Sequence, residues 1–135
     1  MKKIKVGQIG KGSFGKKILS KLEKMSDVSV EWVYGSKDKW WESDVDLDWV
    51  IVASPNEFHY EQSKYYLEKG VNVFCEKPGT LATHSLLELI SHSELKDVCF
   101  YVDDVLTYED ILPVNDFVYK KWGGLSANII DRMAY

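Results

Sequence analysis

Strand-like and helix-like patterns alternate along this chain of 135 residues. Alternating or continuous apolar runs predict five strands, at residues 3–9, 28–34, 48–54, 71–75 and 97–102. Apolar residues at helical spacing predict helices at residues 14–25, 55–70 and 83–93, and Pro113 suits the first turn of another that runs to about residue 121. This alternation predicts an α/β fold, a doubly wound parallel sheet with helices on both faces.

A glycine-rich loop joins the first predicted strand to the first predicted helix. Gly10, Gly12 and Gly15 have the spacing G-x-G-x-x-G, which in this context is typical of dinucleotide-binding loops. The glycines permit a tight turn, close approach of the backbone to a pyrophosphate and close packing of the helix, whose N-terminus attracts phosphate. We therefore expect a Rossmann-type domain in which the loop, with Ser13 and Phe14, binds a dinucleotide. A glycine-rich turn without a ligand is the alternative.

The end of the second predicted strand bears on the choice between NAD and NADP. Dinucleotide-binding domains usually place an acidic residue about 20 positions after the glycine loop, where it binds the adenine ribose. This chain has Gly35 there, followed by Ser36 and Lys37, and a hydroxyl beside a cation suits a 2′-phosphate. The residues therefore favour NADP slightly over NAD. Asp38 is an alternative ribose ligand if the strand ends later than predicted. For Lys37, the alternative is a solvated loop lysine.

Polar segments follow the ends of three predicted strands, at residues 10–15, 54–56 and 76–78. Because ligands of open α/β sheets bind beyond the carboxyl ends of the strands, we expect these segments to meet at one edge. The last segment is the most unusual, since the apolar run VNVFC stops abruptly at Glu76 and Lys77. A lysine beside a carboxylate at such an edge suits proton transfer, and the alternative is a surface ion pair in a loop.

The motifs taken together resemble one family. KVGQIGKGSFG, ASPNEFH and EKP, at these separations, are similar to the N-terminal domain of the glucose–fructose oxidoreductase / inositol dehydrogenase / MocA-type (Gfo/Idh/MocA) oxidoreductases. The resemblance runs from about residue 3 to about residue 102. It implies an NAD(P)-dependent oxidoreductase that transfers a hydride to or from a sugar, a cyclitol or a similar small hydroxyl or carbonyl substrate.

The resemblance also implies a role for the turn after the third strand. Ser54, Pro55 and Asn56 match the turn that borders the cofactor in that family. His59 matches the family's histidine on the helix that follows, and a partly buried helix histidine is the alternative at this position.

Glu76, Lys77 and Pro78 match the family's signature after the fourth strand. In the family the lysine lies near the nicotinamide and the substrate hydroxyl, where it assists hydride and proton transfer, and the glutamate lies beside the cofactor. The resemblance thus implies that Lys77 is the catalytic residue, and that all three residues border the cofactor. Pro78 fixes the turn and is a candidate for an unusual peptide geometry.

The C-terminal part departs from the family pattern. Family members usually carry a second, substrate-binding domain, and residues 122–135 resemble only its start or form an extra edge strand. Residues 1–121 are then the dinucleotide-binding domain, truncated before the second domain and catalytically incomplete alone. A non-catalytic Rossmann module with a nucleotide-binding or regulatory role is the other function class.

Composition and charge argue against several further classes. The formal net charge is -4 and the lysines are scattered, which disfavours a nucleic-acid partner. We expect a cytoplasmic protein, because no apolar run approaches the ~20 residues of a membrane span and the N-terminus does not have the pattern of a signal peptide. Cys75 and Cys99 are expected to be reduced, buried thiols, and no metal site is expected. The apolar tail favours a homo-oligomer or pairing of chains.

Overall fold

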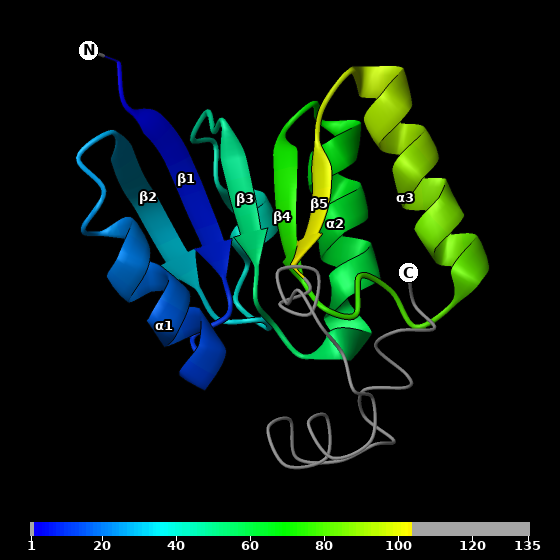
Figure 1. Ribbon diagram of the computed structural model, residues 1–135, viewed down its shortest axis with the longest axis horizontal. Helices are drawn as coiled ribbons and strands as arrows, with labels where there is room; N and C mark the ends of the chain where they lie inside the picture. Colours follow the sequence, from blue (N-terminus) through cyan, green and yellow to red (C-terminus); the bar gives the residue numbers. More distant parts are fainter. Residues whose placement is uncertain (1, 104–135) are drawn as a thin grey trace, which may run out of the picture.

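A computed structural model describes residues 2–103 of the chain. The predicted helix after Pro113, the tail at residues 122–135, and therefore the domain boundary and the tail pairing, lie outside the described residues. The elements in chain order are β1 (Ile4–Ile9), α1 (Ser13–Leu22), β2 (Val28–Tyr34), the 3₁₀ turn η1 (Trp40–Glu42), β3 (Trp49–Val52), the 3₁₀ turn η2 (Asn56–Phe58), α2 (His59–Glu68), β4 (Asn72–Glu76), α3 (Thr83–Lys96) and β5 (Phe100–Asp103) (Figure 1).

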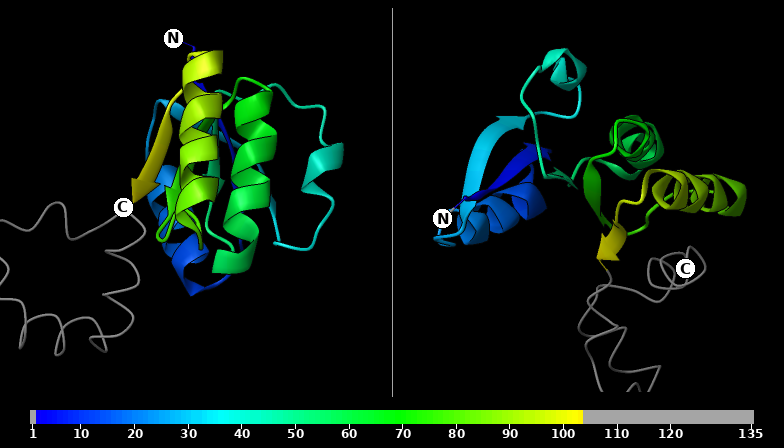
Figure 2. Two further views of the ribbon diagram at one scale, coloured as in Figure 1. Left: turned by 90° about the vertical axis from the view of Figure 1, so that its right-hand side faces the viewer. Right: turned by 90° about the horizontal axis from the view of Figure 1, so that it is seen from above.

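The described strands form one parallel sheet in the order β2-β1-β3-β4-β5. The chain runs outward from β1 to β2 and then crosses back to β3, so the strand order reverses between β1 and β3. Helix α1 covers one face of the sheet, whereas η1, α2 and α3 lie on the other (Figure 2). The predicted doubly wound α/β fold is therefore confirmed.

The apolar core lies between the sheet and the helices α2 and α3. It is built from the alternate strand residues that point to this face, together with one leucine from each helix: Ile9, Val50, Val52, Val73, Cys75, Leu67 and Leu89, all fully buried. Each such side chain stabilises the fold by about 1.5–3 kcal/mol relative to an exposed one. Because these residues fix β1, β3 and β4 side by side, they also fix the spacing of the loops that follow those strands.

Several element boundaries differ from the sequence prediction. Helix α1 ends at Leu22 rather than at residue 25, and α2 begins only at His59, after the 3₁₀ turn η2. Helix α3 continues to Lys96 and ends on Asp97, whose φ of 52° is left-handed, so β5 starts only at Phe100. Cys99 therefore lies in the connection before the strand, and the prediction that it is buried is wrong. Cys75 is buried as predicted. None of the helices within residues 2–103 is long and apolar enough to cross a membrane.

Candidate functional site

The carboxyl ends of β1, β3 and β4 bring the three predicted polar segments to one edge of the sheet. These strands are neighbours, and Ile9 lies in register with Val52, which in turn lies in register with Cys75. All the strands point to the same edge (Figure 1). The segments 10–15, 54–56 and 76–78 therefore leave the sheet side by side, as the sequence predicts.

The three glycines of the loop after β1 differ in what a side chain at each position would contact. Gly10 has a φ of 117°, and a β-carbon there would clash with the Ala53 carbonyl. A β-carbon at Gly15 would clash with the Gly10 carbonyl. Gly12, in contrast, has a φ of -71°, and a β-carbon there would meet no described atom within 4 Å. The fold therefore requires Gly10 and Gly15, while the space beside Gly12 is open to a ligand.

The N-terminus of α1 presents its amides to the same open space. Gly12 caps the helix without a side-chain hydrogen bond, and no acidic residue lies in the first turn. The first amides of a helix have no intrahelical acceptor and carry a partial positive charge. Ser13 and Phe14 are exposed at this end, and Lys11 and Lys16 flank it. The residues present therefore fit the pyrophosphate of a dinucleotide.

Gln8 supports the glycine loop from within the sheet. Its side chain is fully buried, and its Nε2 donates hydrogen bonds to the carbonyl oxygens of Gly10 (3.0 Å) and Gly15 (2.8 Å). This residue was not predicted to belong to the site. The signal in the sequence was a polar side chain inside the apolar strand KVGQI, because a buried amide requires hydrogen-bond partners.

A second polar connection joins the loops that follow β2 and β3. The hydroxyl of Ser54 donates a hydrogen bond to Oε1 of Gln62 (2.6 Å), and Nε2 of Gln62 donates to the carbonyl of Ser36 (3.3 Å). Ser54 and Gln62 are both buried. This connection fixes the turn that carries Ser36 relative to the turn that carries Ser54.

His59 connects the loops that follow β3 and β4. Its ring is fully buried, with Nδ1 2.6 Å from the carbonyl oxygen of Pro78 and Nε2 2.7 Å from that of Ser54. His59 therefore holds the turn at Ser54 and the turn at Pro78 in position from beneath the edge of the sheet. Pro55 and Asn56 are instead exposed at the edge, where a ligand has access to them.

The turn after β2 holds a carboxylate, Asp38, three residues after the position expected for the ribose ligand. Asp38 accepts hydrogen bonds from the Gly35 amide (2.6 Å) and from Nζ of Lys11 in the glycine loop (3.4 Å). Both contacts lower the pKa of Asp38, the amide more than the lysine. Ser36 is half-buried and Lys37 is exposed. Lys11 was not predicted; it compensates the charge of Asp38.

Glu76 ends β4 as a buried residue rather than as part of an exposed loop. Its side chain is 7% exposed, so the alternative of a surface ion pair is wrong for this residue. Burial, followed by the neighbouring carboxyl of Asp103, raises the pKa of Glu76 to about 7. Lys77 is half-buried, Pro78 is buried, and the peptide bond between them is cis. No group of three His, Cys, Asp or Glu side chains within residues 2–103 could hold a metal ion.

The raised pKa of Glu76 predicts a loss of stability as the pH rises. The folded chain binds the proton of the Glu76 carboxyl more tightly than the unfolded chain does. Protonated Glu76 therefore stabilises the fold fully below pH 4.5, and this stabilisation is lost as the pH rises through about 7. We expect Glu76→Gln to raise the free energy of unfolding by about 2 kcal/mol at pH 8 relative to the wild type, and to change it little at pH 5. Urea denaturation at both pH values measures this. An equal effect at the two pH values would contradict the assignment.

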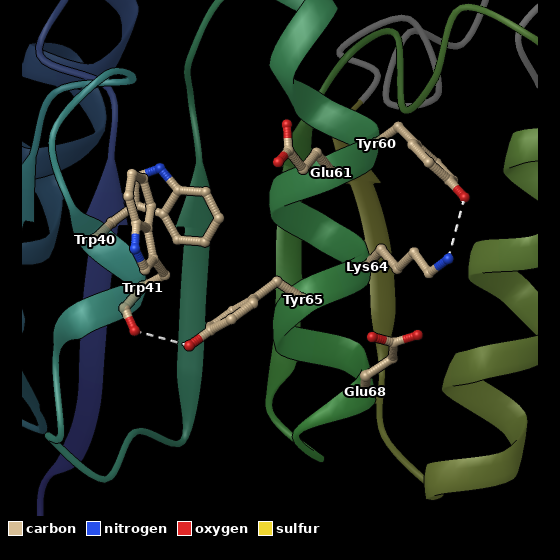
Figure 3. A pocket seen from close by; sticks show the side chains of 7 residues that line it. All are labelled: Trp40, Trp41, Tyr60, Glu61, Lys64, Tyr65 and Glu68. Atoms are coloured by element: carbon tan, nitrogen blue, oxygen red, sulfur yellow. Dashed lines mark hydrogen bonds between the residues drawn. The ribbon is translucent and has the colours of Figure 1, made fainter.

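A shallow pocket lies away from this edge, over the outer side of α2 and η1. Figure 3 shows Trp40, Trp41 and Tyr65 facing one another on one side of α2, while Tyr60 and Lys64 point towards α3. The Tyr65 hydroxyl donates a hydrogen bond to the Trp41 carbonyl (2.8 Å). These rings pack η1 onto α2, so we regard the pocket as a structural feature.

Comparisons with known proteins agree with this geometry. The sequence pattern of an oxidoreductase family with an NAD-binding Rossmann fold, Gfo/Idh/MocA, matches residues 19–104. The chain belongs to this family. The resemblance predicted from the sequence is thereby confirmed, and the chain is an NAD(P)-binding domain of the Gfo/Idh/MocA oxidoreductases.

Individual relatives are longer than this chain, which matches only part of each. An oxidoreductase of Streptococcus pneumoniae is 27% identical in an alignment of 122 positions that covers 78% of this chain and 33% of the relative. The scyllo-inositol 2-dehydrogenase (NADP(+)) of Bacillus subtilis is 38% identical over 52 residues, which are 38% of this chain and 16% of the relative.

A solved structure supports the same fold. An NAD-binding protein from Listeria innocua matches with a TM-score of 0.69 at 24% identity, over 76% of this chain and 34% of the other. The chain thus spans about a third of the length of the relatives that it matches over most of its own length.

Proposed function

We propose that the carboxyl edge of this sheet binds a nicotinamide dinucleotide for an oxidoreductase. The observation that carries the proposal is the open space at Gly12, beside an α1 N-terminus with neither a capping side chain nor an acidic residue. The pyrophosphate lies against Gly12 and Ser13, with Phe14 at the same end. Buried polar side chains hold the surrounding loops in place, so the protein does not have to order them when the ligand binds.

The nicotinamide end of the ligand lies, in this proposal, along the turns after β3 and β4. Pro55 and Asn56 border it on one side, and Glu76, Lys77 and Pro78 border it on the other. The dinucleotide supplies or accepts the hydride. Lys77 exchanges a proton with the substrate oxygen, which fits a half-buried lysine in the first position after β4. His59 positions the two turns relative to each other.

The substrate is a sugar, a cyclitol or a similar small polyol. This proposal is supported by two relatives, the scyllo-inositol 2-dehydrogenase of Bacillus subtilis and the D-glucoside 3-dehydrogenase of Escherichia coli. Turnover requires the substrate to be held against the nicotinamide, and positioning supplies roughly 7–11 kcal/mol of a barrier. We therefore expect residues 1–135 to bind a dinucleotide and to show no useful dehydrogenase activity on their own.

The cofactor preference leans to NADP because of the charges after β2. Lys11 compensates the carboxylate of Asp38, which leaves the positive charge of Lys37 beside the turn. No ion pair of Lys37 occurs within residues 2–103. A 2′-phosphate can accept a hydrogen bond from the Ser36 hydroxyl and a charge-assisted one from Lys37.

The test of this preference is the substitution Lys37→Glu. A charge-assisted hydrogen bond is worth about 1.5–3 kcal/mol, so we expect the affinity for NADP to fall about 10- to 100-fold and the affinity for NAD to change much less. Isothermal titration with both dinucleotides measures this. Lys3→Glu, which changes the charge equally near the opposite end of β1, is the control and should affect neither. Equal losses of affinity for NAD and NADP would mean that Lys37 is a solvated loop residue.

A further inference from the structure

Two carboxyl groups lie side by side where β4 and β5 end. Glu76 is the last residue of β4, and its register partner is Asp103, the last residue of β5. Register partners on neighbouring parallel strands point to the same face of the sheet. Glu76 is 7% exposed, and its Oε1 has no hydrogen-bond partner among residues 2–103.

Such a pair is unfavourable when both groups are ionised. Two adjacent carboxylates repel each other, and a buried carboxylate oxygen without a donor loses its hydration without compensation. A single proton held between the two groups removes one charge and supplies the missing donor. The same contact contributes, after burial, to the raised pKa of Glu76.

The charged neighbours of the pair within residues 2–103 are lysines. Lys77 follows Glu76 directly. Its backbone amide and its positive charge lower the pKa of Glu76, which burial raises. The Cys75 thiol has its pKa raised to about 12 by burial, so it carries no charge. Val52 of β3 and Ala53 after it contribute no ionisable side chain. Lysines of α1 and of the turn that follows it lie across an open groove from Asp103: Lys16, Lys17, Lys21 and Lys24. Tyr101 lies two residues before Asp103 on β5.

We propose that Glu76 and Asp103 share one proton at neutral pH, and that loss of this proton makes the site favour the oxidised over the reduced dinucleotide. The inference rests on the proposed function, because it takes the nicotinamide to lie beside the EKP turn. An oxidised nicotinamide ring carries a positive charge, and the reduced ring carries none. A doubly ionised carboxyl pair therefore attracts the oxidised ring more strongly, and the singly protonated pair discriminates less.

The ratio of the two dissociation constants, reduced over oxidised, follows from this charge change. The carboxyl pair releases one proton between pH 6 and pH 8.5. We therefore expect the ratio to rise about tenfold over this range in the wild type. Asp103→Asn removes the second carboxylate and leaves a side-chain amide that can donate to Glu76. In this variant the ratio should stay constant over the same range.

The experiment combines two measurements on the full chain. Isothermal titration with NADP⁺ and NADPH, and with NAD⁺ and NADH, gives the ratio as a function of pH. Carboxyl ¹³C NMR of the ligand-free chain follows Glu76 directly; its titration should have a midpoint near neutral pH in the wild type and move to lower pH in Asp103→Asn. Asp97→Asn is the control, since it removes an exposed carboxylate at a left-handed position that asparagine also tolerates.

The outcomes separate this inference from the proposed function. A Glu76 carboxyl that titrates in the ordinary acidic range overturns the shared proton. A wild-type ratio that does not change with pH, or an equal rise in Asp103→Asn, overturns the discrimination between oxidation states. If neither form binds, the proposed function fails and the discrimination fails with it, while the NMR titration still decides whether the two carboxyl groups share a proton.

Discussion

Replacing Gly12 with valine is expected to abolish dinucleotide binding, with a loss of affinity of at least about 100-fold. The valine side chain would occupy the space through which a pyrophosphate approaches the first amides of α1. The protein itself leaves that space open, since a β-carbon at Gly12 meets no described atom within 4 Å. Isothermal titration with the preferred dinucleotide measures the loss.

The same substitution should leave the fold intact. The φ of Gly12 is -71°, which any residue adopts, so the expected cost is the loss of a favourable N-cap residue, about 1 kcal/mol or less. Ser20→Val, on the exposed side of the same helix, is the control and should bind as the wild type does. Wild-type affinity in Gly12→Val would show that the glycine loop does not hold phosphate.

Lys77→Ala is expected to reduce turnover by a factor of about 10²–10⁴ in a protein that joins this domain to a substrate-binding domain. The expected loss is that of a general acid or base, because Lys77 follows β4 directly at the edge where the glycine loop also ends. Steady-state kinetics with a polyol substrate measure it. Because the role is in proton transfer, the free energy of unfolding should change far less, by about 1 kcal/mol or less.

Two comparisons make the Lys77 result specific. Lys3→Ala, near the opposite end of β1, should leave turnover unchanged. Lys77→Ala should also keep its affinity for the dinucleotide within a few-fold of the wild type, because the pyrophosphate contacts lie at Gly12. A large loss of dinucleotide affinity together with unchanged turnover at saturating cofactor would contradict a role in proton transfer.

The sequence predicts the architecture well because the core and the turns use strong local signals. Continuous apolar runs identify β3 and β4, and the spacing of Gly10, Gly12 and Gly15 identifies the loop between β1 and α1. Parallel strands then place every loop that follows a strand at one edge, so the sequence alone predicts that the three polar segments meet. The end of α3 was harder to predict, because a left-handed Asp97 carries no strong signal in the sequence.

The polar connections beneath the site could not be predicted in the same way. Gln62 and His59 join segments that are adjacent only in the folded chain, whereas Gln8 bonds the loop that follows it in the sequence. The partners of all three are mostly backbone carbonyl groups. Carbonyl groups are the same at every residue, so the sequence does not show which of them a side chain will reach. The pairing of Glu76 with Asp103 depends similarly on the register of β4 and β5.

The central claim is that the loops after β1, β3 and β4 form one dinucleotide site, and NMR of the uniformly ¹⁵N-labelled chain tests it most directly. On titration with NADP⁺ or NAD⁺, the amides of residues 10–15, 54, 56, 76 and 77 should shift together with a single dissociation constant. The amides at the amino ends of the strands, such as those of Ile4 and Asn72, should stay in place. The absence of shifts at millimolar dinucleotide, or shifts confined to the pocket over α2 and η1, would contradict the claim.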